Sequence, residues 1–138
     1  MSDKRFVDSN ILVYAHDVDD PKKQEIAKNL LKSLWRSKTG TLSMQVLQEF
    51  YSVATRKLST RISKSVARLA VEEYSLWCIE TTPKEIASAF RIEDSSKIGF
   101  WDSLIVAAAL KAGATEILSE DMNSGQTIAG IRIVNPFA

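Results

Sequence analysis

Short apolar runs alternate with helix-like stretches along the chain, and this alternation constrains the fold more than any other feature. Apolar runs around Phe6, Ile117 and Ile133 are bounded by polar or turn residues and have the length of strands. The longer segments between such runs repeat apolar residues at the helical period. Strands that alternate with helices of this length form a parallel sheet with helices on both faces. We therefore expect an α/β fold, a three-layer αβα sandwich around a central parallel sheet.

The same patterns give the approximate bounds of each element. The expected strands are 5–7, a short strand ending near Leu42, 77–79, 116–118 and 131–134. The expected helices are 11–16, one from Pro21 through Leu34, one from Ser43 to about Leu58, one around 65–74, one from Pro83 that carries Ile86, Ala87 and Phe90, and 101–111. Gly113 follows the last helix as its expected C-cap.

Length and composition limit the function classes. The 138 residues contain no repeat and no linker-like tract, so we expect a single domain, 1–138. Lys and Arg number 18 against 17 Asp and Glu, which excludes a globally cationic nucleic-acid coat. One cysteine, Cys78, and one histidine, His16, exclude an intrachain disulfide, a CxxC zinc site and chemistry based on two histidines. With no long apolar run or leader, we expect a cytoplasmic protein without membrane contact.

Four carboxylates are expected at one edge of the sheet. Asp8 ends the first strand, and Asp121 follows the strand at 116–118. Asp102 opens the most apolar helix, and Glu49 lies in the second turn of the helix that begins after Ser43. In an open parallel sheet, the strand ends and the starts of the following helices share the edge where ligands bind. Glu49 and Asp102 also fall in phase with the apolar side of their helices.

Converging carboxylates repel one another, so they are either partly protonated or bound to a cation. Oxygen ligands suit Mg²⁺ or Mn²⁺, and such an ion activates water and stabilises charge on a phosphate without any histidine. Each acid also has a purely structural interpretation. Asp8 is a helix cap, Asp102 complements the helix dipole, and Asp121 closes an Asx-turn. Glu49 lies too far into its helix to act as a cap.

At these positions the sequence resembles the PIN-domain family, and within it the VapC-type toxins of bacterial and archaeal toxin–antitoxin pairs. The segments that carry the resemblance are 6–12, 48–50, 101–109, 117–122 and 130–137. The resemblance implies a parallel αβα sandwich with Mg²⁺- or Mn²⁺-dependent endoribonuclease activity. Ser9 stands where threonine is commoner in the family, and Asn123 stands where some members have a fifth acid. The second difference leaves the number of metal ions open.

The resemblance also implies a role for each site residue. The acidic quartet carries over onto Asp8, Glu49, Asp102 and Asp121, and two supporting polar positions carry over onto Asn10 and Ser119. Asp8 and Asp102 are expected to bind the principal ion, with Glu49 and Asp121 acting through water or a second ion. The expected partners are an RNA substrate, a cognate antitoxin and a second copy of the chain in a homodimer.

Five basic residues lie between Glu49 and Glu72, a stretch without any acid. They are Arg56, Lys57, Arg61, Lys64 and Arg68, which form either an RNA-binding surface or an ordinary solvated face. Trp35, Trp77 and Trp101 are expected to serve packing rather than base stacking, with Trp101 the best placed to contact substrate. Two alternatives stay open beside the toxin ribonuclease, namely a structure-specific DNA nuclease and a non-catalytic module that binds RNA or a partner.

Overall fold

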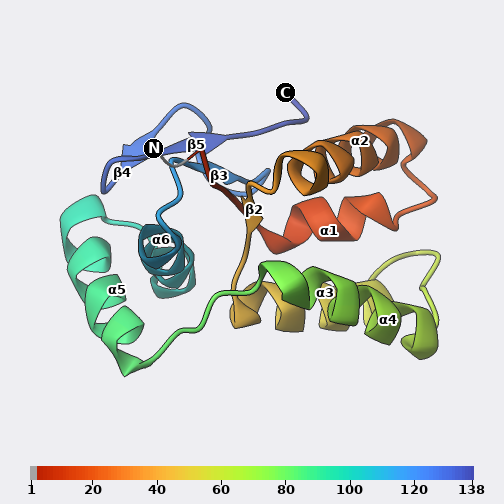
Figure 1. Ribbon diagram of the computed structural model, residues 1–138, viewed down its shortest axis with the longest axis horizontal. Helices are drawn as coiled ribbons and strands as arrows, with labels where there is room; N and C mark the ends of the chain where they lie inside the picture. The colour runs from red at the N-terminus through yellow and green to blue at the C-terminus, as the bar shows by residue number, and fades with distance from the viewer. Residues whose placement is uncertain (1–2) are drawn as a thin grey trace.

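A five-stranded sheet runs through the centre of the computed structural model, which describes residues 3–138 (Figure 1). The strands are β1 (Arg5–Val7), β2 (Gly40–Thr41), β3 (Glu116–Leu118), β4 (Thr127–Ile128) and β5 (Ile131–Val134). Their order is β2-β1-β3-β5-β4, and each neighbouring pair is parallel except β4 with β5. The predicted α/β fold is confirmed, and the short antiparallel edge strand β4 is an addition to it.

Local sequence signals explain where the helices begin and end. The helices are α1 (Ser9–Ala15), α2 (Pro21–Ser37), α3 (Met44–Arg56), α4 (Lys64–Tyr74), the 3₁₀ turn η1 (Ser75–Trp77), α5 (Pro83–Ser96) and α6 (Phe100–Ala112). The Asp20 side chain caps α2, and Thr82 with Glu85 forms a capping box on α5. Gly113 ends α6 with a φ of 73°, a left-handed conformation that favours glycine. None of the helices in the described part of the chain is long and apolar enough to span a membrane.

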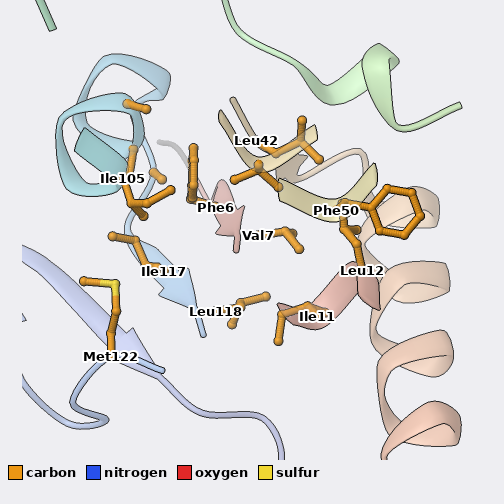
Figure 2. Close-up of a cluster of buried hydrophobic side chains, with 14 of the residues drawn as sticks. Phe6, Val7, Ile11, Leu12, Leu42, Phe50, Ile105, Ile117, Leu118 and Met122 are labelled. Carbon is orange, nitrogen blue, oxygen red and sulfur yellow. The ribbon is translucent and has the colours of Figure 1, made fainter. Parts of the chain in front are cut away.

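Alternate side chains of the central strands pack against different helical layers. Phe6 of β1 pairs in register with Ile117 of β3, and both are fully buried. Figure 2 shows these two side chains near Ile105 of α6, whereas Leu118 lies beside Ile11 of α1. Helix α6 contacts β1, β3 and β5, with α5 packed against it, and α1 and α2 lie on the other side of the sheet (Figure 1). The hydrophobic core therefore spans both interfaces of the sandwich.

One sequence-based expectation about elements is wrong, and the helix expected from Pro83 is confirmed. The run 77–79 forms no strand, because η1 ends at Trp77 and a single parallel bridge joins Cys78 to Leu42. Helix α5 buries Ala89 and Ile92, while Ile86 and Phe90 are 41% and 52% exposed. Helix α5 packs along α6, and its apolar side chains that face away from this contact are left at the surface.

Candidate functional site

The parallel pairing of β1 with β3 places two polar residues side by side at the carboxyl edge of the sheet. Asp8 follows β1, and its backbone N–H donates to the Leu118 carbonyl at 3.0 Å. Ser119 follows β3, and its N–H donates to the Val134 carbonyl at 3.0 Å. These bonds extend the ladder by one residue on each strand. The side chains that follow the strands are therefore held as rigidly as the sheet itself.

Asp8 is a buried carboxylate, only 6% exposed. Its Oδ2 accepts hydrogen bonds from Ser119 Oγ at 2.7 Å and from Asn10 Nδ2 at 3.3 Å, and its Oδ1 accepts from the Ser9 N–H at 2.8 Å. Burial raises the pKa of Asp8 to about 6; the charges of Glu49 and Asp121 add to this, and the hydrogen bonds from Ser119 and Ser9 oppose it. The structure thus makes the negative charge of Asp8 costly unless a cation compensates it.

Asn10 connects the two ends of the chain at this edge. Its amide nitrogen lies 3.2 Å from both Ser119 Oγ and Asp121 Oδ2, in addition to its contact with Asp8. Its amide oxygen accepts a hydrogen bond from the Glu120 N–H at 3.1 Å. With a donor and an acceptor both engaged, the amide has one orientation, and it sets the positions of Asp8 and Asp121.

Glu49 joins the same cluster from α3. Its Oε2 accepts a hydrogen bond from Ser9 Oγ at 2.9 Å, and its Oε1 accepts one from Gln45 Nε2 at 3.0 Å. The Gln45 amide also donates to the Trp101 carbonyl at 3.3 Å, which ties α3 to the start of α6. The Ser9 hydroxyl therefore makes this contact with Glu49. A threonine, which is commoner at this position in the family that the sequence resembles, has the same hydroxyl.

Asp102 lies at the rim of the cluster, in the first turn of α6. The expectation that it faces the core is wrong, because the residue is exposed. Partial burial nevertheless raises the pKa of Asp102, and the charges of Asp121 and Glu49 raise it further. Its carboxylate accepts no hydrogen bond from any residue in the described part of the chain, so it is free to bind a ligand.

The donor set of this cluster fits a hard divalent cation, since every candidate ligand atom is a carboxylate oxygen. The negative charges of Glu49 and Asp121 raise the pKa of both Asp8 and Asp102, so these carboxylates repel one another. A bound cation would offset this repulsion. Among residues 3–138, however, no three acid, His or Cys side chains stand close enough to form a closed metal site. A Mg²⁺ ion is commonly held by one or two carboxylates and several water molecules, so an ion bound here would use these acids together with water.

The structure adds supporting residues that the sequence did not single out. Glu120 accepts hydrogen bonds from Tyr14 at 2.6 Å and forms a 2.5 Å ion pair with Lys23 of α2. Because the Glu120 N–H also bonds Asn10, this pair anchors the turn that carries Asp121. The signal available in the sequence was the position of Glu120 between two site residues. Nothing in the sequence pointed to Lys23.

The predicted basic residues are all exposed but lie at different distances from the acids. The loop that joins α3 to α4 lies at the end of this helix pair away from the sheet (Figure 1). Arg56, Lys57, Arg61 and Lys64 belong to that end. Arg68 instead lines a groove between α3 and α4 with Gln48, the residue that precedes Glu49. It is the basic side chain best placed to contact a ligand that extends from the acid cluster.

The remaining residues singled out in the sequence are structural or exposed. His16 lies against Phe50 and contacts the Tyr74 hydroxyl at 3.0 Å, and burial lowers the pKa of His16. Trp35 is 48% exposed and packs against Trp77 at 5.3 Å between ring centroids, whereas Trp101 is 66% exposed. Trp101 immediately precedes Asp102, at the rim of the acid cluster.

A family model for the PIN domain matches residues 5–125, a span that includes all four acids. The chain belongs to the PIN domain family. Comparison with curated protein sequences gave no match. The family match confirms the family that the sequence motifs predicted. Solved structures with the same fold come from several bacteria.

Three solved structures illustrate how this PIN domain compares with others. A toxin–antitoxin complex from Klebsiella pneumoniae is 18% identical, with a TM-score of 0.69 and coverage of 96% of this chain and 98% of that chain. The sarcin–ricin loop cleaving toxin VapC20 from Mycobacterium tuberculosis is 18% identical, with a TM-score of 0.64 and coverage of 94% and 99%. VapBC2 from Rickettsia felis, bound to a promoter DNA fragment, is 19% identical, with a TM-score of 0.63 and coverage of 94% and 96%. At this identity, the likeness establishes the fold.

Proposed function

We propose that this PIN domain is a metal-dependent endoribonuclease that hydrolyses RNA phosphodiester bonds as the toxin of a toxin–antitoxin pair. The observation that carries the proposal is the buried carboxylate of Asp8, which is held by Asn10 and Ser119 and is electrostatically coupled to Glu49 and Asp121. A buried acid of this kind is expensive to keep charged without a cation. Perturbed acids grouped at the ligand-binding edge of an α/β sheet are typical of catalytic sites.

Each residue has a role that follows from its contacts. Asp8 and Asp102 would hold a Mg²⁺ or Mn²⁺ ion, and such an ion would stabilise charge on the phosphate and favour ionisation of water. Asn10 and Ser119 fix the orientation of the Asp8 carboxylate. Glu49 and Asp121 flank it and position the attacking water. With water rather than the ribose 2′-hydroxyl as nucleophile, the products carry a 5′-phosphate and a 3′-hydroxyl.

The proposed partners are an RNA, a cognate antitoxin and a second copy of the chain. Structures of the same fold include a toxin–antitoxin complex and a toxin that cleaves the sarcin–ricin loop, which supports the toxin role. In a homodimer, the second copy of the chain would cover exposed apolar side chains such as Phe90 on α5 and Leu110 on α6. A toxin that acts on cellular RNA works in the cytoplasm.

The test is RNA cleavage by the purified, antitoxin-free protein. Total cellular RNA is incubated with Mg²⁺, Mn²⁺ or EDTA, and the termini of the products are mapped. We expect cleavage with either ion, none in EDTA, and a loss of more than about 100-fold in Asp8→Asn and Asp102→Asn. The matched control is Asp94→Asn, which neutralises an exposed acid of α5 outside the cluster and leaves the rate unchanged.

Other outcomes separate the alternatives. Cleavage that persists in EDTA, or in both site variants, contradicts the metal–carboxylate mechanism. Cleavage of flap or junction DNA in preference to RNA indicates a structure-specific DNA nuclease. A protein that binds RNA and never cuts it is a binding module.

A further inference from the structure

A pocket of about 390 Å³ opens beside the acid cluster, between the start of α3, the start of α5 and the first turns of α6. The lining residues that matter here are Ser43, Gln45, Gln48, Ile86, Trp101 and Leu104. Gln45 hydrogen-bonds both Glu49 and the Trp101 carbonyl, so the wall of this pocket is fixed to the acid cluster. We propose that it binds one nucleobase of the RNA strand next to the cleaved phosphate and selects for that base.

The first observation that points to a ligand is an unpartnered hydroxyl. Ser43 is 3% exposed, and its Oγ has no hydrogen-bond partner among residues 3–138. Ser43 occupies the N-cap position of α3, yet its side chain makes no capping hydrogen bond. A buried polar atom without a partner is costly, and such atoms are rare in folded proteins. Ser43 lines the pocket, so a rotation of its side chain toward the pocket would let a polar group of a bound base satisfy this hydroxyl.

The second observation is the exposed indole of Trp101. The side chain is 66% exposed although it lines the pocket, and its ring packs edge-on against Phe100 at 5.2 Å between centroids. An exposed aromatic face that is supported on one side is suited to stacking on a base. Leu104 and Ile86 supply apolar walls of the kind that cover a flat ring.

The polar groups favour a base over a phosphate. Among the lining residues, Glu85 is the one charged side chain, and the Thr82 N–H and Lys111 already hold its carboxylate. None of the lining residues is a Lys or Arg, so the pocket offers no positively charged side chain to a phosphate. Gln45 uses its amide hydrogens on Glu49 and Trp101, which leaves its amide oxygen to accept from a base N–H. The exposed Gln48 adds a second amide at the rim.

A base also fits better than an apolar side chain of a protein partner, because an apolar group would leave Ser43 Oγ unsatisfied. This inference rests on the proposed function for the identity of the strand as RNA. The acid cluster must hold the phosphate under that function, and Trp101 directly precedes Asp102. The pocket therefore lies where a neighbouring base of a bound strand would come.

The test compares Ser43→Ala, Trp101→Ala and Trp101→Phe with wild type and with Leu76→Ala, which changes an exposed apolar residue outside this pocket. The first measurement is the affinity for a labelled oligoribonucleotide in EDTA, with a single abasic position moved along the strand. In wild type, we expect one abasic position to weaken binding by about 10-fold. That difference should disappear in Trp101→Ala, shrink in Ser43→Ala, and persist in Trp101→Phe and Leu76→Ala.

The Ser43→Ala variant keeps the test independent of folding. Removing an unpartnered buried hydroxyl should leave the melting temperature unchanged or raise it, so a loss of base discrimination cannot come from unfolding. The second measurement is cleavage of the four base variants at the same position with Mg²⁺ or Mn²⁺. We expect the wild-type preference among the four bases to be lost in Ser43→Ala and Trp101→Ala and to be kept in Leu76→Ala.

Failures of the two proposals differ. If the wild-type protein cleaves RNA, and if the loss of affinity at the abasic position is the same in Ser43→Ala and Trp101→Ala as in wild type, the base-pocket proposal alone is wrong. If the wild-type protein shows an abasic effect on binding that depends on Trp101 but never cleaves RNA, the ribonuclease proposal is wrong and the base-pocket proposal stands. If no abasic position weakens wild-type binding, or if Trp101→Ala instead dissociates a dimer in sedimentation velocity with the base effect intact, the pocket does not bind a base.

Discussion

At the level of single residues, the amide of Asn10 touches Asp8, Ser119 and Asp121 and receives a hydrogen bond from the Glu120 backbone. It carries no charge and is a poor candidate for a metal ligand in this arrangement, because its nitrogen faces the acids. Its contribution is to hold two acids from opposite ends of the chain at a fixed separation. Side chains in this supporting position commonly matter nearly as much as the ligands.

We predict that Asn10→Ala lowers kcat for RNA cleavage by about 10- to 100-fold with a smaller change in KM. The reason is that Asp8 and Asp121 lose their shared donor while the surface that binds RNA is unchanged. Asn10→Asp should be more harmful, since it adds a carboxylate to a cluster that already repels itself. Steady-state kinetics on one substrate check this, with the exposed Asn123→Ala as control. Equal kcat in wild type and Asn10→Ala would contradict it.

The raised pKa of Asp8 predicts how stability depends on pH in the absence of a divalent ion. The folded-state pKa is about 6 and the ordinary value is 3.8, so the folded protein binds this proton more tightly than the unfolded chain. The contribution is therefore largest at low pH, falls as pH rises between these values, and is constant above about 6. The shift corresponds to about 3 kcal/mol at most.

The measurement is the free energy of unfolding in EDTA between pH 4 and pH 7 for wild type and Asp8→Asn. The difference between the two proteins should shift in favour of wild type as the pH is lowered. His16, whose pKa is lowered by burial, acts in the opposite direction, and Asp102 acts in the same direction as Asp8. Both are present in each protein and cancel in the comparison. A difference that is independent of pH would show that Asp8 titrates normally.

At the level of elements, α2 reaches the site through one ion pair. Lys23 contacts Glu120 and lies over the Tyr14 ring at 4.8 Å, while Glu120 belongs to the turn between Ser119 and Asp121. We predict that Lys23→Met and Glu120→Gln each lower kcat severalfold, and that the double variant is no worse than either single one. The coupling energy for stability should be about 1 kcal/mol or less, because both side chains are partly exposed. Additive losses in kcat would show that the two residues act separately.

The groove between α3 and α4 gives Arg68 a different role from that of the more distant basic residues. We predict that Arg68→Ala weakens RNA binding and reduces the slope of log Kd against log salt by about 1, as for a single phosphate contact. Lys57→Ala, at the far end of α3, is the matched control and should have a smaller effect. Titrations in EDTA at several salt concentrations measure both. Equal slopes of log Kd against log salt in the two variants would show that Arg68 makes no special contact with the RNA.

Elements were predictable from the sequence where a local signal marks them. Pro21 and Pro83 begin helices, Gly113 ends one, and the strand at 116–118 stands between turn residues. The segment 77–79 misled because its apolar side chains fill space beside β2 without continuous pairing. The short strand β4 has no apolar run that would mark it in the sequence. It forms because the turn at Ala129 and Gly130 brings it back against β5.

The site was predictable to the extent that sheet topology dictates it. The ends of parallel strands must meet, so the proximity of Asp8 and Ser119 follows from the order of strands. The exposure of Asp102 did not follow, because helical phase alone does not say which residues of a helix's first turn the rest of the fold covers. The ion pair of Lys23 with Glu120 depends on the packing of α2, which no local pattern encodes.

At the level of the whole molecule, repulsion among the acids is a cost of folding that a cation removes. We predict that Mg²⁺ or Mn²⁺ stabilises the wild-type protein and so raises its melting temperature. At an ion concentration a hundredfold above Kd, the free energy of unfolding should increase by about 3 kcal/mol. The effect should vanish in Asp8→Asn and Asp102→Asn and persist in Asp94→Asn. Differential scanning fluorimetry with Ca²⁺ as a comparison ion measures it. An equal rise in all variants would indicate nonspecific binding.

The acids come from four segments that are spread along the sequence, from Asp8 after the first strand to Asp121 after the third. No contiguous piece of the chain shorter than this span contains them all, and β1 pairs with β3 across more than a hundred residues. During synthesis, the growing polypeptide therefore has no complete acid cluster until almost all of it has left the ribosome. Under the proposed toxin role, that interval would be the time in which a cell supplies the antitoxin.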